Sequence, residues 1–123
     1  MPTVAISTLL KNSLSGSFVD NNGATTSGTI TPTGYSTQYE ILGLTGTITI
    51  AIPSGTPSAG QKLTLRIKDN GTSRTINWTT TSGGYRVIGT ILPTATTAGK
   101  NTYVGCIYNA TDSYWDVVAV TTE

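Results

Sequence analysis

The sequence predicts an all-β protein, an antiparallel β-sandwich of jelly-roll type with about eight strands. Short runs alternate apolar and polar residues, which is typical of strands with one buried face. Turn-forming residues separate these runs at spacings of roughly 8–12 residues, as in sandwiches and barrels. Thr supplies about a fifth of the chain and charged residues only 11%, and β-branched Thr suits a pleated, half-exposed surface. No segment has the periodicity of an amphipathic helix.

The clearest strand candidates are two alternating runs in the middle of the chain. Residues 47–52 place three isoleucines on one face, and residues 62–68 likewise place three apolar side chains on one face. The second run leads into Asn70-Gly71, a dipeptide that accepts positive φ at low cost. We therefore expect residues 74–78 to return as the hairpin partner of residues 62–68.

The remaining strand candidates are a terminal hairpin and three shorter runs. Residues 102–108 and 114–120 are expected to pair, because residues 109–113 between them are turn formers. The shorter runs, each bounded by Gly or Pro, are residues 28–31, 38–42 and 85–88.

Residues 1–26 differ from the rest, and we expect an N-terminal arm there, with residues 27–123 as the β-sandwich domain. The 123 residues fit one domain of ordinary size. Loop-forming residues are frequent in the first 26, and the apolar residues are spaced too loosely for a helix. We interpret the apolar residues as anchors on a partner protein. The candidate interface residues are Val4, Ile6, Leu9, Leu10, Leu14 and Phe18.

The residue inventory argues against catalysis and against zinc or iron sites. One Cys and no His leave the chain without the usual ligands and without the commonest general base. We therefore expect no enzymatic activity, no metal site and no cofactor. Cys106 lies in an apolar run and is interpreted as a buried, inert thiol. A calcium site formed by Asp69, Asp112 and Asp116 is conceivable, but turn chemistry is the favoured interpretation of these carboxylates.

Charge and aromatic content limit the choice of partner. The net charge is +1 and the basic residues are scattered, which gives no reason to expect nucleic acid or an anionic membrane. No signal peptide and no membrane span are predicted. The aromatic residues crowd the C-terminal half, where packing in the core and at interfaces is favoured over a saccharide-binding platform. They are Trp78, Tyr85, Tyr103, Tyr108, Tyr114 and Trp115.

Five sequence elements follow one another in the C-terminal half. They are Gly60–Ile67, Gly71–Trp78, Tyr85-Arg86 with Leu92-Pro93-Thr94, Tyr103–Asn109 and Trp115–Ala119. Their order and spacing resemble a family of small bacteriophage virion proteins and tail-fibre modules. Residues 41–59 also fit the pattern, whereas the arm lies outside it. The resemblance implies a structural role in a phage particle.

Within that role, the leading hypothesis is a capsid decoration (cement) protein that bridges neighbouring capsid subunits on the outside of the head. Its expected partners are the major capsid protein and further copies of itself in a homotrimer. It would be made in the host cytoplasm and reside on the capsid surface of the virion. A short single domain with an apolar arm favours this hypothesis. The alternative is a tail-fibre or receptor-binding module that contacts host surface saccharide.

Overall fold

The computed structural model describes residues 18–123, and within this range every regular element is a β-strand. The all-β prediction is therefore confirmed. The strands in this range are β1 (Val19–Asn21), β2 (Gly28–Ile30), β3 (Gln38–Leu44), β4 (Ile48–Ile50), β5 (Lys62–Asp69), β6 (Ile76–Trp78), β7 (Tyr85–Val87), β8 (Thr102–Asn109) and β9 (Tyr114–Thr122).

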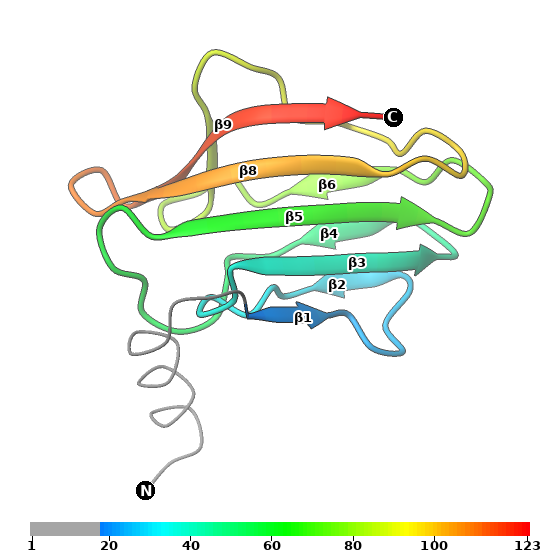
Figure 1. Ribbon diagram of the computed structural model, residues 1–123, viewed down its shortest axis with the longest axis horizontal. Helices are drawn as coiled ribbons and strands as arrows, with labels where there is room; N and C mark the ends of the chain where they lie inside the picture. The colour runs from blue at the N-terminus through cyan, green and yellow to red at the C-terminus, as the bar shows by residue number, and fades with distance from the viewer. Residues whose placement is uncertain (1–17) are drawn as a thin grey trace, which may run out of the picture.

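The strands form two layers (Figure 1). The larger sheet has six strands in the order β1-β3-β5-β8-β9-β7, and the smaller sheet, behind it in this view, has the order β2-β4-β6. A jelly-roll order is not confirmed. Most neighbouring strands pair in parallel, and within residues 18–123 only β5–β8 and β8–β9 are antiparallel.

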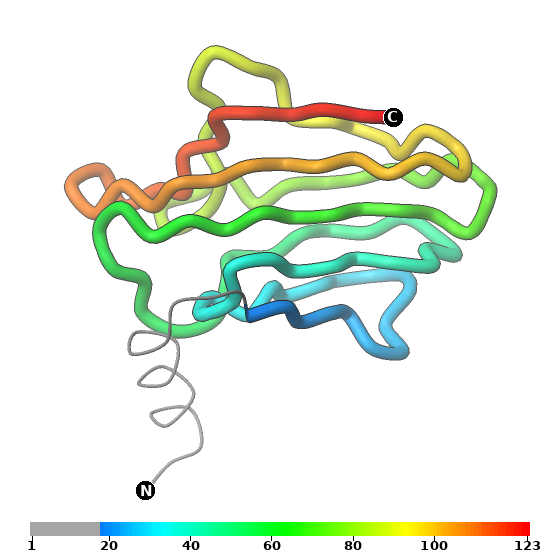
Figure 2. The backbone as a smooth tube through the Cα atoms, in the orientation of Figure 1, coloured from blue at the N-terminus to red at the C-terminus, as the bar shows by residue number. Residues whose placement is uncertain are grey.

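From β1 to β6 the chain alternates between the two sheets, so that each passage adds one strand to each layer (Figure 2). In the larger sheet Val19 lies opposite Gln38, and Gln38 lies opposite Thr64. In the smaller sheet Ile48 lies between Gly28 and Ile76. Parallel neighbours require a crossover connection, and here each crossover runs through the opposite sheet. The arrangement is a short parallel β-solenoid of three turns, which the β8–β9 hairpin and β7 extend.

The predicted hairpin between residues 62–68 and 74–78 is wrong. Strands β5 and β6 belong to different sheets, and β6 pairs with β4. Asn70-Gly71 does form a turn, with Gly71 at a φ of 105°, but this turn carries the chain from one sheet to the other. The terminal hairpin is confirmed, because β8 and β9 pair in antiparallel register from Asn109 opposite Tyr114 to Thr102 opposite Thr122.

The two sheets enclose one apolar core. Strand β5 shows how the alternating pattern builds it, since Leu63, Leu65 and Ile67 are fully buried while their neighbours in the strand face outward. Burying a side chain of this size contributes about 1.5–3 kcal/mol. The other core residues are Ile30, Tyr39, Ile41, Leu44, Ile48, Ile50, Ile76, Tyr85, Val104, Cys106, Trp115 and Val117.

Of residues 18–26, which fall in the expected arm, Val19–Asn21 form β1 in the larger sheet. Strand β1 pairs in parallel with β3. The buried side chain of Asn22 fastens the chain after β1: Nδ2 donates to the Leu42 carbonyl at 3.0 Å, and Oδ1 accepts from the Leu42 N–H at 3.0 Å. Residues 1–17 lie outside the described part of the chain.

Candidate binding surface at the β7 edge

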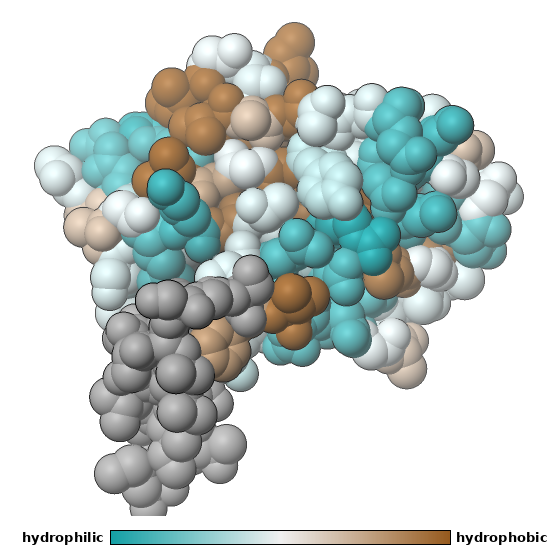
Figure 3. Space-filling view, viewed as in Figure 1, coloured by the Kyte–Doolittle hydropathy of each residue, from teal (hydrophilic) through white to brown (hydrophobic). Residues whose placement is uncertain are grey.

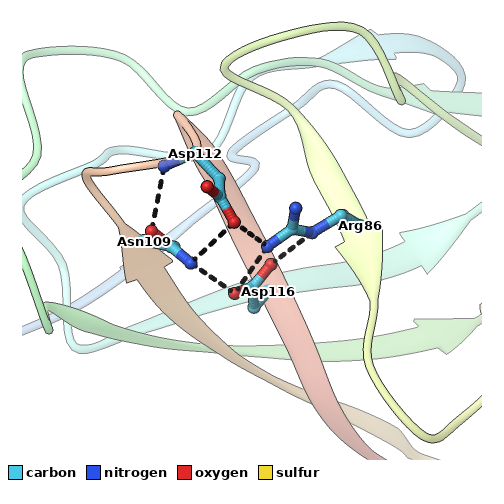
Figure 4. A network of polar contacts seen from close by, with 4 residues as sticks. All are labelled: Arg86, Asn109, Asp112 and Asp116. Carbon is cyan, nitrogen blue, oxygen red and sulfur yellow. Dashed lines mark hydrogen bonds and ion pairs between the residues drawn. The ribbon is translucent and has the colours of Figure 1, made fainter.

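Strand β7 is one edge of the larger sheet, and its parallel pairing with β9 brings Arg86 opposite Asp116. The Arg86 Nε–H donates to Asp116 Oδ1 at 2.8 Å, and Nη2 donates to Asp116 Oδ2 at 3.1 Å. Nη2 also donates to Asp112 Oδ2 at 3.0 Å. Figure 4 shows the two carboxylates converging on one side of the guanidinium. A bidentate Arg–carboxylate pair fixes orientation as well as contributing energy.

Asn109 completes the network from the other side of the β8–β9 turn. Its Nδ2 donates to Asp112 Oδ2 at 3.2 Å and to Asp116 Oδ2 at 3.3 Å, and its Oδ1 accepts from the Asp112 N–H at 3.0 Å. The hydrogen bonds from Arg86 to Asp116 and Asp112 raise the pKa of the guanidinium. The arginine is therefore a fixed cation, held in place from β9 and from the turn.

A depression opens beside this network. The Arg86 Cζ lies 5.0 Å from the centre of the Tyr114 ring, a cation–π distance. The depression has a volume of about 490 Å³, within the range of small-molecule sites. Its lining residues are Thr80, Tyr85, Arg86, Val87, Leu92 and Tyr114.

Apolar side chains are exposed next to the depression. We define the β7 patch as Val87, Ile88, Ile91 and Val118. Ile91 is 81% exposed, and the other three are 39–47% exposed. Figure 3 shows apolar side chains gathered over the segment that follows β7, above β9. Large apolar residues gathered on a surface mark a site of interaction more often than scattered ones do.

Asp69 lies away from Asp112 and Asp116, so these three carboxylates do not meet in a calcium site. Asp69 is buried, and its Oδ1 accepts from the Gly71 and Gly99 N–H groups, both at 2.8 Å. Its Oδ2 accepts from the Thr96 hydroxyl at 2.5 Å. Within residues 18–123 no group of three His, Cys, Asp or Glu side chains is placed to hold a metal ion. The interpretation of Asp69 as a turn residue is confirmed.

Most of the aromatic residues belong to the core, as the favoured interpretation predicts. Trp115 and Tyr85 are each 1% exposed, while Trp78 and Tyr108 pack against the core cluster. The Tyr85 hydroxyl donates to the Ala51 carbonyl at 3.0 Å, and burial raises the pKa of this phenol. A broad platform of exposed aromatics is therefore absent from residues 18–123, although Tyr114 lines the depression.

Cys106 is the buried thiol that its sequence context predicts. It is 3% exposed on β8, within the core. Burial raises its pKa to about 12. The thiolate that nucleophilic chemistry requires is therefore strongly disfavoured at neutral pH.

Of the predicted interface residues, the structure describes Phe18. It is half-buried beside β1, and its carbonyl accepts from the N–H groups of Thr37 and Gln38 at 2.8 and 3.2 Å. The other five, Val4, Ile6, Leu9, Leu10 and Leu14, lie outside the described residues.

Asp112 and Asp116 are candidate site residues in the sequence, but their contact with Arg86 is not predictable from it. The hairpin turn places the two carboxylates near each other, which is a local signal. Arg86 reaches them only because β7 pairs with β9 in the finished sheet. No spacing along the chain marks that pairing.

No protein-family model matches this chain, and no curated protein matches it either. A solved structure described as the structure of a chaperone-substrate complex has a similar fold, with a TM-score of 0.51 and 14% identity. The match covers 85% of this chain and 17% of that chain. This protein thus spans about a sixth of the matched chain's length, and at this identity the likeness shows the fold alone. No helix within residues 18–123 is long and apolar enough to cross a membrane.

Proposed function

We propose that the protein is a bacteriophage structural protein that decorates the outside of the capsid by binding the major capsid protein. The β7 patch is the proposed contact surface. The resemblance of residues 41–120 to phage virion proteins supports a structural role. The observation that carries the proposal is the exposure of Ile91, Ile88, Val87 and Val118 at the β9–β7 side of the larger sheet. Contact with another protein would remove this apolar area from water, and the burial contributes about 25 cal/mol of favourable free energy per Å².

The proposal includes a homotrimer on the capsid surface. Several copies held together engage several capsid sites at once, which raises the overall affinity without any new contact. The low charge of the chain, 11% of residues, suits a surface that is largely covered in an assembly. The proposed role requires binding alone and no catalytic group.

The test is cosedimentation of the purified protein with phage capsids that lack it. Replacing Ile88 and Ile91 together by Ser should reduce the bound fraction at least tenfold, because each lost anchor weakens binding by about 1 kcal/mol or more. The matched control is Tyr103→Ser, since Tyr103 is 39% exposed on β8 and belongs neither to the expected arm nor to the β7 patch. Equal binding of both variants would remove the β7 patch from the proposal. Absence of binding by the unmodified protein would exclude capsid decoration.

A second candidate function is a receptor-binding module of the tail that contacts host saccharide. The observation that favours it is the depression, because it combines apolar and aromatic walls with polar groups. Val87 belongs both to the depression and to the β7 patch. The two functions therefore compete for the same edge of the sheet. Copy number distinguishes them: quantitative mass spectrometry should find many copies per particle for a head protein and a handful for a tail protein.

A further inference from the structure

We infer that the depression beside β7 is a binding site for an uncharged pyranose ring, held through the rim formed by Thr80, Arg86 and Tyr114. This inference rests on the second candidate function and gives it a ligand class.

The walls are divided into an apolar part and a polar rim. Val87 and Leu92 supply accessible apolar surface, and the buried Tyr85 lies behind them. The Tyr85 hydroxyl is already bonded to the Ala51 carbonyl, so this residue adds no polar group to the depression. A pyranose has the matching division, with C–H groups on its faces and hydroxyls around its edge. Aromatic and aliphatic walls suit the C–H faces.

The rim carries hydrogen-bonding groups that lack partners within residues 18–123. Arg86 uses Nε and Nη2 for the two aspartates, while its Nη1 has no acceptor in this range. The hydroxyls of Thr80 and Tyr114 make no hydrogen bond in the same range. An arginine N–H can only donate, whereas a hydroxyl both donates and accepts. The hydroxyl groups and ring oxygen of a sugar complement this set.

The charge around the rim disfavours an anionic ligand. Asp112 and Asp116 both pair with Arg86 and leave one negative charge in excess. Their bonded oxygens already accept hydrogen bonds from Arg86 and Asn109. A sugar carboxylate or a phosphate would meet two like charges close by, while an uncharged sugar would not. The charge balance therefore selects neutral sugars over acidic ones.

The rim is also held rigid before any ligand arrives. The bidentate Asp116 contact fixes the plane of the Arg86 guanidinium, and that guanidinium covers the Tyr114 ring at 5.0 Å. The Ser113 carbonyl accepts from the Gly83 N–H at 2.6 Å, which ties the β8–β9 turn to the loop that carries Thr80. Groups that are already ordered lose less conformational entropy on binding.

The test is an NMR titration of the ¹⁵N-labelled protein with the methyl glycosides of glucose, galactose and mannose, and with methyl glucuronide. We expect at least one neutral glycoside to shift the amide signals of residues 80–92 and 114 at millimolar concentrations, and methyl glucuronide to bind at least tenfold more weakly. Tyr114→Phe and Thr80→Val should each weaken neutral binding about 3- to 10-fold, the equivalent of one hydrogen bond. Tyr103→Phe is the matched control, since Tyr103 is exposed and pairs with Thr121 at the far end of the hairpin.

Three outcomes would overturn the inference: no response to any neutral glycoside, tighter binding of the glucuronide, or unchanged affinity in both rim variants. Adsorption of the labelled protein to host cells, measured in parallel, tests the receptor-binding function separately. Adsorption without glycoside binding would overturn the inference and leave that function standing. Glycoside binding at the rim without adsorption would support the inference and remove that function.

Discussion

At the scale of single residues, Asp69 has the clearest thermodynamic role. It ends β5 at the point where the chain leaves the larger sheet, and it holds the loop before β8 through Thr96 and Gly99. Burial alone would raise its pKa. The hydrogen bonds from Thr96, Gly99 and Gly71, together with the nearby charge of Arg74, outweigh burial and lower the pKa below its ordinary 3.8. The folded state therefore favours the ionised carboxylate.

This shift has a defined consequence for stability against pH. Because the pKa is lower in the folded state, the contribution of Asp69 is complete above about pH 4 and is lost as the pH falls through the folded value. Asp69→Asn should lower the free energy of unfolding by about 1–3 kcal/mol at pH 7 and flatten its decline in acid. Urea unfolding at a series of pH values measures both effects.

The control for this experiment is Glu123→Gln. Glu123 also has a lowered pKa, caused first by its hydrogen bond from the Asn101 N–H, but it is exposed at the C-terminal end. We expect its removal to flatten the decline in acid less than Asp69→Asn does, because solvent screens the interactions of this exposed carboxylate. Identical acid curves for Asp69→Asn and the unmodified protein would contradict the role given to Asp69.

At the scale of elements, local pattern predicts where strands lie but not which strands are neighbours. Each of the eight expected segments overlaps an observed strand. Strand β1 was missed because Val19–Asn21 runs directly into the loop formers Asn22 and Gly23, which favour an arm or loop. Alternation identifies the buried face of a strand but not its neighbours. The predicted pairing of β5 with β6 was wrong because Asn-Gly occurs in crossovers as well as in hairpins. Prediction of the site from the sequence is limited in the same way, since Arg86 and Asp116 meet only through the pairing of two strands distant in the chain.

A pair of glycines tests how tightly the connections between elements are packed. A Cβ on Gly34, in the loop between β2 and β3, would overlap the backbone carbonyl of Ser54. Gly34→Ala should therefore destabilise the fold by about 1–3 kcal/mol or more. A Cβ on Gly105, within β8, would lie 3.7 Å from the Ala119 Cβ, an ordinary contact. Gly105→Ala should be neutral or stabilise by up to about 1 kcal/mol. Thermal unfolding of both variants checks the predicted difference, and equal destabilisation would contradict it.

At the scale of the whole molecule, the solenoid path was missed because its turns differ in length. Val19 pairs with Gln38, but Gln38 pairs with the more distant Thr64. A fixed period along the sequence is the usual signature of stacked repeats, and insertions in the connections remove it here. The stacking is visible only as strand register.

The expected N-terminal arm leads to a prediction for the intact particle. The core found in residues 18–123 extends from Ile30 to Val117, so deleting residues 1–15 should leave the sandwich folded. Under the decoration hypothesis the same deletion should abolish cosedimentation with capsids. Near-UV circular dichroism, dominated by the buried Trp115 and Tyr85, reports on the fold. Loss of that signal in the truncated protein would contradict the arm assignment.

The alternation of the chain between the two sheets also bears on how such a protein changes in length over evolution. Each passage contributes one strand to each layer and stacks apolar residues in register, as Ile30, Ile50 and Trp78 or Ile48 and Ile76 do in the smaller sheet. Tandem duplication of one passage would lengthen both layers at once and preserve the β8–β9 hairpin with the β7 edge. A gene encoding this fold can therefore yield longer or shorter domains by copying a short internal segment, while the β7 edge stays the same.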